Sequence, residues 1–120
     1  MYTSITNLLM HHKNLRALRL SNMHFASNIQ GWYDIFTACL YAAQTHSFQV
    51  IEISQAPYLT NDALLYYYSL LHQSQTTESL INMKKLPKII IRSCIQINNN
   101  YDTTNDNVLT NLIPHLHIYH

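Results

Sequence analysis

The sequence predicts one α/β domain in which short parallel strands alternate with helices and stack side by side as a repeating solenoid. Three observations predict it: a short apolar pattern recurs, helix-like segments separate its copies, and Gly and Pro are scarce. With one Gly and three Pro, the chain lacks the residues that tight hairpins need, so helices must join the strands. A single domain also fits the 120 residues, of which 48% are hydrophobic.

The recurring pattern is a six-residue segment with apolar side chains at its first, fourth and sixth positions. It occurs at 15–20, 48–53 and 86–91, and it begins again at 113–118. Positions four and six point to one face of a strand, and position one enters the same interior from the preceding turn. One copy cannot bury that face alone, so successive copies must stack. We therefore predict strands near 15–20, 48–53, 86–91 and 115–119.

Amphipathic segments between these strands predict the connecting helices, near 3–12, 32–45, 61–73, 77–84 and 104–112. The opening helix would bury Ile5, Leu8 and Leu9. The apolar stripe of the next helix is Trp32, Ile35, Phe36, Cys39, Leu40 and Ala43. The stripe of the third is Leu64, Leu65, Tyr68 and Leu71. In the run 66–68, one Tyr should pack inward and two should remain outside.

The third copy carries a family resemblance. Leu86, Ile89 and Ile91 are followed by Cys94 and then Ile97. This pattern resembles the cysteine-containing, ribonuclease-inhibitor-like class of leucine-rich repeats, as in F-box leucine-rich-repeat proteins and related mitotic-exit regulators.

The other copies resemble the family less closely. The segment 59–64, Leu-Thr-Asn-Asp-Ala-Leu, is similar to the segment that follows the strand in the family, with one residue inserted. Met23 and Ala56 stand where the family has Cys or Asn. The resemblance implies a leucine-rich-repeat solenoid over 1–120, of about three repeats and a partial fourth. Its parallel sheet would line the concave side and its helices the convex side.

In such a solenoid the binding surface is the concave face, formed by the outward residues of successive strands. The predicted partner-binding residues are Arg19, Asn22, Glu52, Gln55, Lys88, Arg92, His117 and Tyr119. Because equivalent residues on adjacent strands lie about 4.8 Å apart, Arg19 and Glu52 should be neighbours able to form an ion pair. The alternative interpretation is a solvated pair that contributes about 0–1 kcal/mol and recognises nothing.

The resemblance implies a non-catalytic protein-protein interaction module, and more narrowly the substrate-recognition part of an F-box-type ubiquitin ligase receptor. The family's F-box, an N-terminal helical segment, has no recognisable counterpart here. The final strand at 115–119 favours a second hypothesis, a truncated or fragmentary repeat array, because it leaves an unpaired edge without a polar capping repeat. An ordinary α/β domain shares the strand predictions and would differ in strand order.

Composition argues against several other classes. Charged residues make up 11% and the formal net charge is +1, so we expect no nucleic-acid partner. No apolar run approaches the roughly 20 residues of a membrane helix, so we expect no membrane partner. Two separated Cys, Cys39 and Cys94, are typical of a reducing compartment, cytoplasmic or nuclear.

No catalytic, cofactor or metal site is predicted. Cys39 and Cys94 lie in apolar patterns and are interpreted as small buried hydrophobes. His115 and His117 share one strand face, but zinc normally needs three or four convergent ligands. An enzymatic role would need His117 and Cys94 within hydrogen-bond reach of each other or of an acid, and no motif suggests it.

Overall fold

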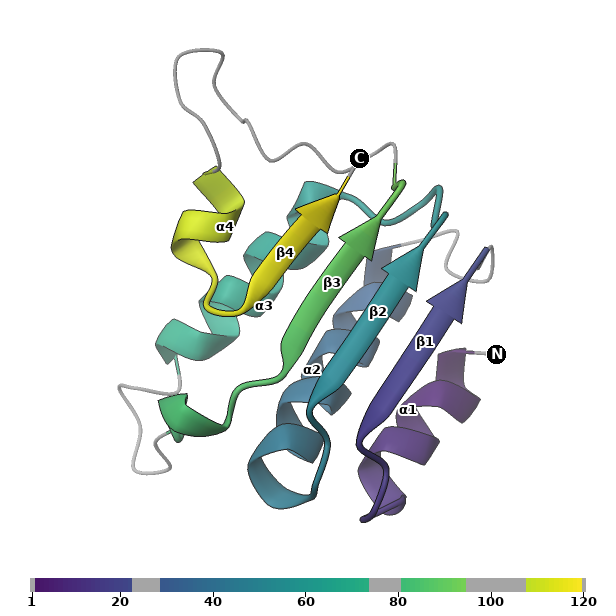
Figure 1. The fold of residues 1–120 in the computed structure, drawn as a ribbon, viewed down its shortest axis with the longest axis vertical. Helices are drawn as coiled ribbons and strands as arrows, with labels where there is room; N and C mark the ends of the chain where they lie inside the picture. The colour runs from purple at the N-terminus through teal and green to yellow at the C-terminus, as the bar shows by residue number, and fades with distance from the viewer. Residues whose placement is uncertain (1, 23–28, 74–80, 95–107, 120) are drawn as a thin grey trace.

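The structure is a computed structural model that describes residues 2–22, 29–73, 81–94 and 108–119 (Figure 1). Helices and strands alternate along the chain. In order they are α1 (Tyr2–His11), β1 (Ala17–Ser21), α2 (Ile29–Thr45), β2 (Val50–Ser54), α3 (Asn61–Gln73), the 3-10 turn η2 (Met83–Lys85), β3 (Lys88–Arg92), α4 (Val108–Leu112) and β4 (Leu116–Tyr119).

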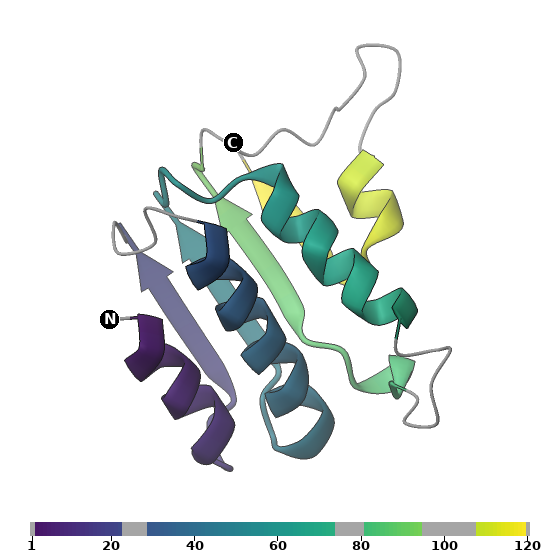
Figure 2. The same cartoon turned by 180° about the vertical axis from the view of Figure 1, so that it is seen from behind.

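The strands form one parallel sheet whose order is the order of the chain, β1-β2-β3-β4. The register keeps equivalent residues of the apolar pattern side by side: Leu18 pairs with Ile51, Ile51 with Ile89, and Ile89 with Leu116. In Figure 1, α1, α2 and α3 lie behind the sheet and α4 lies beside its β4 edge; in Figure 2 the same three helices lie in front of the sheet. The predicted α/β class is thus confirmed, and the strand order does not reverse as it would in a doubly wound sheet.

The core lies between the sheet and the helices. Ile51, Ile53 and Ile89 are fully buried, because the fourth and sixth positions of the pattern face the helices, as predicted. From the helix side, all six residues of the predicted α2 stripe are buried. The rings of Phe36 and Tyr67 meet in this layer with their centroids 6.0 Å apart.

Two of the predicted stripes need correction. In α3 the buried tyrosine is Tyr67, with 0% exposure, whereas Tyr68 is only partly buried. One Tyr of the run does pack inward, but the stripe passes through Leu64, Tyr67 and Leu71. In α1, Leu9 is fully buried and Ile5 packs against the core, while Leu8 is 38% exposed. The spacing alone allowed both faces, and the angle at which each helix packs on its neighbours selected one.

The observed boundaries of α1, α2, α3 and the four strands differ from the predicted ones by at most three residues. The first three strands begin two residues later than predicted and end one residue later. They begin later because the first residue of the apolar pattern lies in the preceding turn and does not pair with the neighbouring strand. α2 begins earlier, at Ile29, and α3 agrees with 61–73. Of the helix predicted at 77–84, residues 77–80 lie outside the described residues, and 81–84 form no α-helix but only the start of the 3-10 turn η2. The start of 104–112 also lies outside the described residues. Met23 and Ile97 lie outside them too.

The same geometry recurs where β1, β2 and β3 end. The residue after each strand, Asn22, Gln55 or Ser93, has a left-handed backbone with φ of 57°, 53° and 54° respectively. Each donates its backbone N–H to the last carbonyl of the next strand, at Ser54, Arg92 and Tyr119, over 2.9, 3.1 and 2.9 Å. Behind the second and third of these turns, Ala56 and Cys94 are buried. Three successive strands therefore leave the sheet in one repeated way.

Candidate functional site

The candidate site is the face of the sheet that the helices of the described residues leave uncovered, here called the helix-free face. Side chains alternate along a strand, so burial of Ile51 and Ile53 on the helix side turns Val50, Glu52 and Ser54 to the other side. Parallel pairing without offset then aligns these positions across the strands. Arg19, Glu52, Ile90 and His117 form one row, and Ser21, Ser54, Arg92 and Tyr119 form the next.

Glu52 is the centre of a charge network on this face. Arg19 Nε lies 2.5 Å from its Oε2, and Arg92 Nε donates to its Oε1 over 2.9 Å. The predicted ion pair between Arg19 and Glu52 is therefore confirmed, and Arg92 joins it from the neighbouring row. The Glu52 side chain is 16% exposed, against 77% for Arg19 and 48% for Arg92. Two guanidinium groups thus screen one carboxylate from solvent.

This arrangement keeps Glu52 ionised. The hydrogen bond from Arg92 is the main reason that the pKa of Glu52 lies below its ordinary value, and the positive charges of Arg19 and Arg92 act in the same direction. Partial desolvation is the second-largest influence and raises the pKa, but the lowering influences together exceed it.

The network continues towards β4 through Arg92. Its guanidinium carbon lies 4.5 Å from the centroid of the Tyr119 ring, a cation–π distance. Tyr119 is 48% exposed, so the ring stays available to a partner while it packs on Arg92. Beside this row, Ser54 Oγ donates to Ser21 Oγ over 3.2 Å. Arg92 is thus held between the carboxylate and the ring.

A shallow hollow of about 340 Å³ lies on the β1 side of the network, lined by Ala17, Leu18, Arg19, Val50, Glu52 and Ile90. Its floor is aliphatic, and Arg19 and Glu52 supply the polar groups. An apolar floor beside a charged wall can take an apolar side chain whose neighbours are polar.

The structure brings together four of the predicted partner-binding residues: Arg19, Glu52, Arg92 and Tyr119. His117 lies exposed in the row of Glu52, beyond Ile90. The other three lie at the ends of the strands. Asn22 and Gln55 are the left-handed residues where β1 and β2 end, and Lys88 is the first residue of β3, at the opposite edge.

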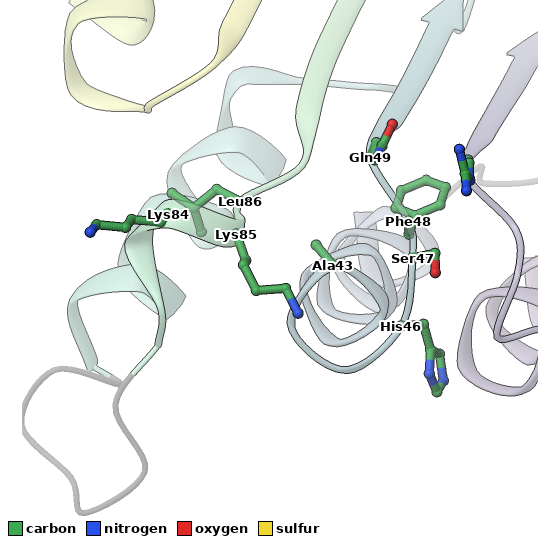
Figure 3. Close-up of a pocket in the computed structure, with 9 residues that line it drawn as sticks. Ala43, His46, Ser47, Phe48, Gln49, Lys84, Lys85 and Leu86 are labelled. Atoms are coloured by element: carbon green, nitrogen blue, oxygen red, sulfur yellow. The ribbon is translucent and has the colours of Figure 1, made fainter.

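That opposite edge, where the strands begin, holds a second surface that the sequence analysis overlooked. A pocket of about 360 Å³ lies there between the end of α2 and η2 (Figure 3). Arg16, Lys84 and Lys85 line it together with His46 and Phe48. The available signal was the local charge pattern, three Lys within 84–88 and two cations at Lys13 and Arg16, in a chain with few charges.

The chemistry of the two thiols is that of buried side chains. Cys39 is fully buried, and desolvation raises its pKa well above that of a free thiol. The pKa of Cys94 is also raised, mainly by burial, and its Sγ lies 3.5 Å from the Arg92 carbonyl oxygen. Both thiols therefore stay protonated at neutral pH and are poor nucleophiles.

Within the described ranges, no three His, Cys, Asp or Glu side chains converge as metal ligands would. Over the same residues, every helix is too short or too polar to cross a bilayer.

No known family model matches the chain, and neither a characterised protein nor a solved structure matches it.

Proposed function

We propose that the chain is a non-catalytic protein-binding module, a leucine-rich-repeat array that holds its partner against the helix-free face. The observation that carries the proposal is the network of Arg19, Glu52, Arg92 and Tyr119 on a sheet face without helices. Arg and Tyr are enriched in the residues that dominate binding energy at protein interfaces. Here Arg19 and Arg92 are paired with Glu52, and Arg92 also packs on Tyr119; side chains already held by such contacts lose less entropy on binding.

The repeat interpretation draws support from the three equivalent strand ends. Asn22, Gln55 and Ser93 share one conformation and one hydrogen bond, as repeats of one structural unit would. Sequential strand order and helices on one side are the further features expected of a solenoid. Membership of a ubiquitin ligase and residence in the cytoplasm or nucleus rest on the resemblance and composition alone, and stay predictions.

The test is affinity capture with the intact chain and two variants of equal charge. The face variant is Arg19→Ala with Arg92→Ala, and the control is Ser4→Glu with Asn7→Glu, two exposed positions on α1. Each pair lowers the net charge by the same amount. If the partner sits on the helix-free face, loss of central Arg contacts should cost about 2 kcal/mol, about thirtyfold in Kd.

The expected result is that proteins captured by the wild-type chain are lost with the face variant and retained with the control. Quantitative mass spectrometry of the eluates measures this. Capture that survives the face variant unchanged would place the binding surface elsewhere and contradict the proposal.

A further inference from the structure

The Lys and Arg side chains of this protein gather at one edge of the sheet. At that edge the strands begin and the helices end (Figures 1 and 2). Five of the seven Lys and Arg residues of the chain belong to it and define the basic edge: Lys13, Arg16, Lys84, Lys85 and Lys88. All five are exposed.

The described acidic residues lie elsewhere. Asp62 is in the first turn of α3, which starts at the opposite edge, and Glu52 is in the middle of β2, paired with Arg19 and Arg92. Asp34 lies in the first half of α2, where Gln30 donates to it. The remaining acids are Glu78, Asp102 and Asp106, outside the described residues. Over the described residues, the basic edge therefore has no carboxylate to neutralise it.

Hydrogen bonds between successive connections hold this edge in place. The side chain of Gln44, near the end of α2, donates to the carbonyls of Asn82 and Lys85 over 3.0 and 2.9 Å and accepts from the Asn82 N–H over 2.8 Å. The Ser47 N–H donates to the Lys13 carbonyl over 3.2 Å. The turns before β1, β2 and β3 are thus joined, so their cations are presented by an ordered backbone.

One cation of the edge has a structural role, and the others do not. Lys85 Nζ lies 3.4 Å from the Gln44 carbonyl, where it compensates the negative end of the α2 dipole. In Figure 3, Lys85 reaches towards the end of α2, whereas Lys84 extends away from it. Within the described structure, the side chains of Arg16, Lys84 and Lys88 have no ion pair or hydrogen bond. Their charge is available to a ligand.

The pocket at this edge combines cations with a few apolar side chains. Ala43, Leu86 and the buried Phe48 line it together with Arg16 and Lys85. Ser47 and Gln49 add neutral hydrogen-bonding groups. Such a lining fits a protein side chain with a carboxylate beside an apolar group better than it fits a sugar-phosphate backbone. Of its two aromatic lining residues, Phe48 is 3% exposed, and His46 is partly buried with its Nε2 2.9 Å from the Met10 carbonyl oxygen. The net charge of +1 is also low for nucleic-acid binding.

We propose that the basic edge is a docking site for an acidic segment of a partner protein, rich in Asp or Glu with interspersed apolar residues. Ala17 and Lys88 are in register across β2, so two strand spacings, about 10 Å, separate the beginnings of β1 and β3. Arg16 directly precedes the first of these strands, and Lys85 lies in the turn before the other. Carboxylates two residues apart in an extended segment are about 7 Å apart, a span that flexible Arg and Lys side chains can meet. This surface is distinct from the helix-free face.

Fluorescence anisotropy with the intact chain tests the proposal. The probe is a short fluorescein-labelled peptide of alternating Glu and Leu, titrated at low and at about 0.15 M ionic strength. The edge variant is Arg16→Gln with Lys84→Gln. The control is again Ser4→Glu with Asn7→Glu, which lowers the net charge equally on the surface of α1.

The wild-type chain should bind the peptide, more tightly at low salt. The edge variant should bind it at least about fivefold more weakly, since each exposed ion pair contributes modestly, and the control should bind like wild type. Circular dichroism verifies that each variant is folded. If the edge variant is not folded, Lys13→Gln with Lys88→Gln replaces it.

Three outcomes would overturn the proposal. One is no binding even at low salt, and another is equal weakening by the control, which would indicate a net-charge effect. The third is preference for another anion. Tighter binding of a single-stranded oligonucleotide than of the peptide would identify a nucleic-acid site, and complete displacement of the peptide by millimolar inorganic phosphate would identify a general anion site. Loss of partner capture by the Arg19 and Arg92 changes, with peptide binding intact, would separate this site from the helix-free face.

Discussion

The two faces of the sheet are made by the same strands and differ in almost every physical respect. Towards the helices, Ile51, Ile53 and Ile91 are at most 1% exposed, and their contribution is burial of apolar area. On the opposite face, one residue away along β2, Glu52 is held by two guanidinium groups in contact with solvent. Adjacent residues of one strand can therefore differ completely in environment: one side chain is buried in the apolar core, and the next joins a solvent-exposed charge network, which is the surface of the proposed function.

The largest expected change in stability comes from a substitution on the buried face of the sheet. Ile53→Ala removes a fully buried side chain and leaves a cavity in the core between the sheet and the helices. We expect it to lower the free energy of unfolding by about 2–5 kcal/mol, measured by urea denaturation. The matched change on the other face, Ser54→Ala, should stay within about 0.5 kcal/mol of wild type. Equal losses for both variants would contradict the division between the faces.

An intermediate effect is expected where the strand ends. Gln55 has φ of 53°, a conformation that costs a non-Gly residue about 1 kcal/mol or more. Gln55→Gly should therefore stabilise the fold by about 0.5–1 kcal/mol, whereas Ser54→Gly, one residue earlier in the strand, should destabilise it by a similar amount. Thermal unfolding of the two variants checks the opposite signs. Destabilisation by both would indicate that the Gln55 side chain makes a contribution larger than the strain.

The smallest expected change in stability comes from the charge network of Glu52, Arg19 and Arg92, and it depends on pH. The pKa of Glu52 in the folded state is lower than its ordinary value of 4.5, so folding favours the ionised form. The resulting stability is present above about pH 4.5 and is lost as the pH falls through the lower folded pKa. Wild type should therefore lose its advantage over Glu52→Gln in acid. Chemical denaturation of both proteins at pH 7 and pH 3 measures it, and a constant difference would contradict the network.

Much of the fold followed from local patterns. The apolar pattern predicted four strands and their inward faces, because alternation in a strand leaves only two directions for each side chain. The α2 stripe was also predictable, since Trp32, Ile35 and Phe36 recur at helical spacing with few competing apolar positions. The ion pair between Arg19 and Glu52 was predictable as well, because the two residues occupy equivalent positions in successive copies of the pattern.

Other features depended on how elements pack. The sequence could not distinguish Tyr67 from Tyr68, because both are apolar enough to face a core and the α3 packing angle decides between them. The contribution of Arg92 to the Glu52 network was missed, since it reaches diagonally from the neighbouring row. The basic edge was missed as well, because its cations come from separate connections.

The sequence by itself determined which segments form strands and helices, and the alternation that separates a dry face from a polar one, since these depend on residues only a few positions apart. The tertiary structure decided between sequential and reversed strand order, which tyrosine is buried and which cations share an edge. The physical reason is that these features depend on contacts between distant segments, whose energies exist only after the strands have stacked.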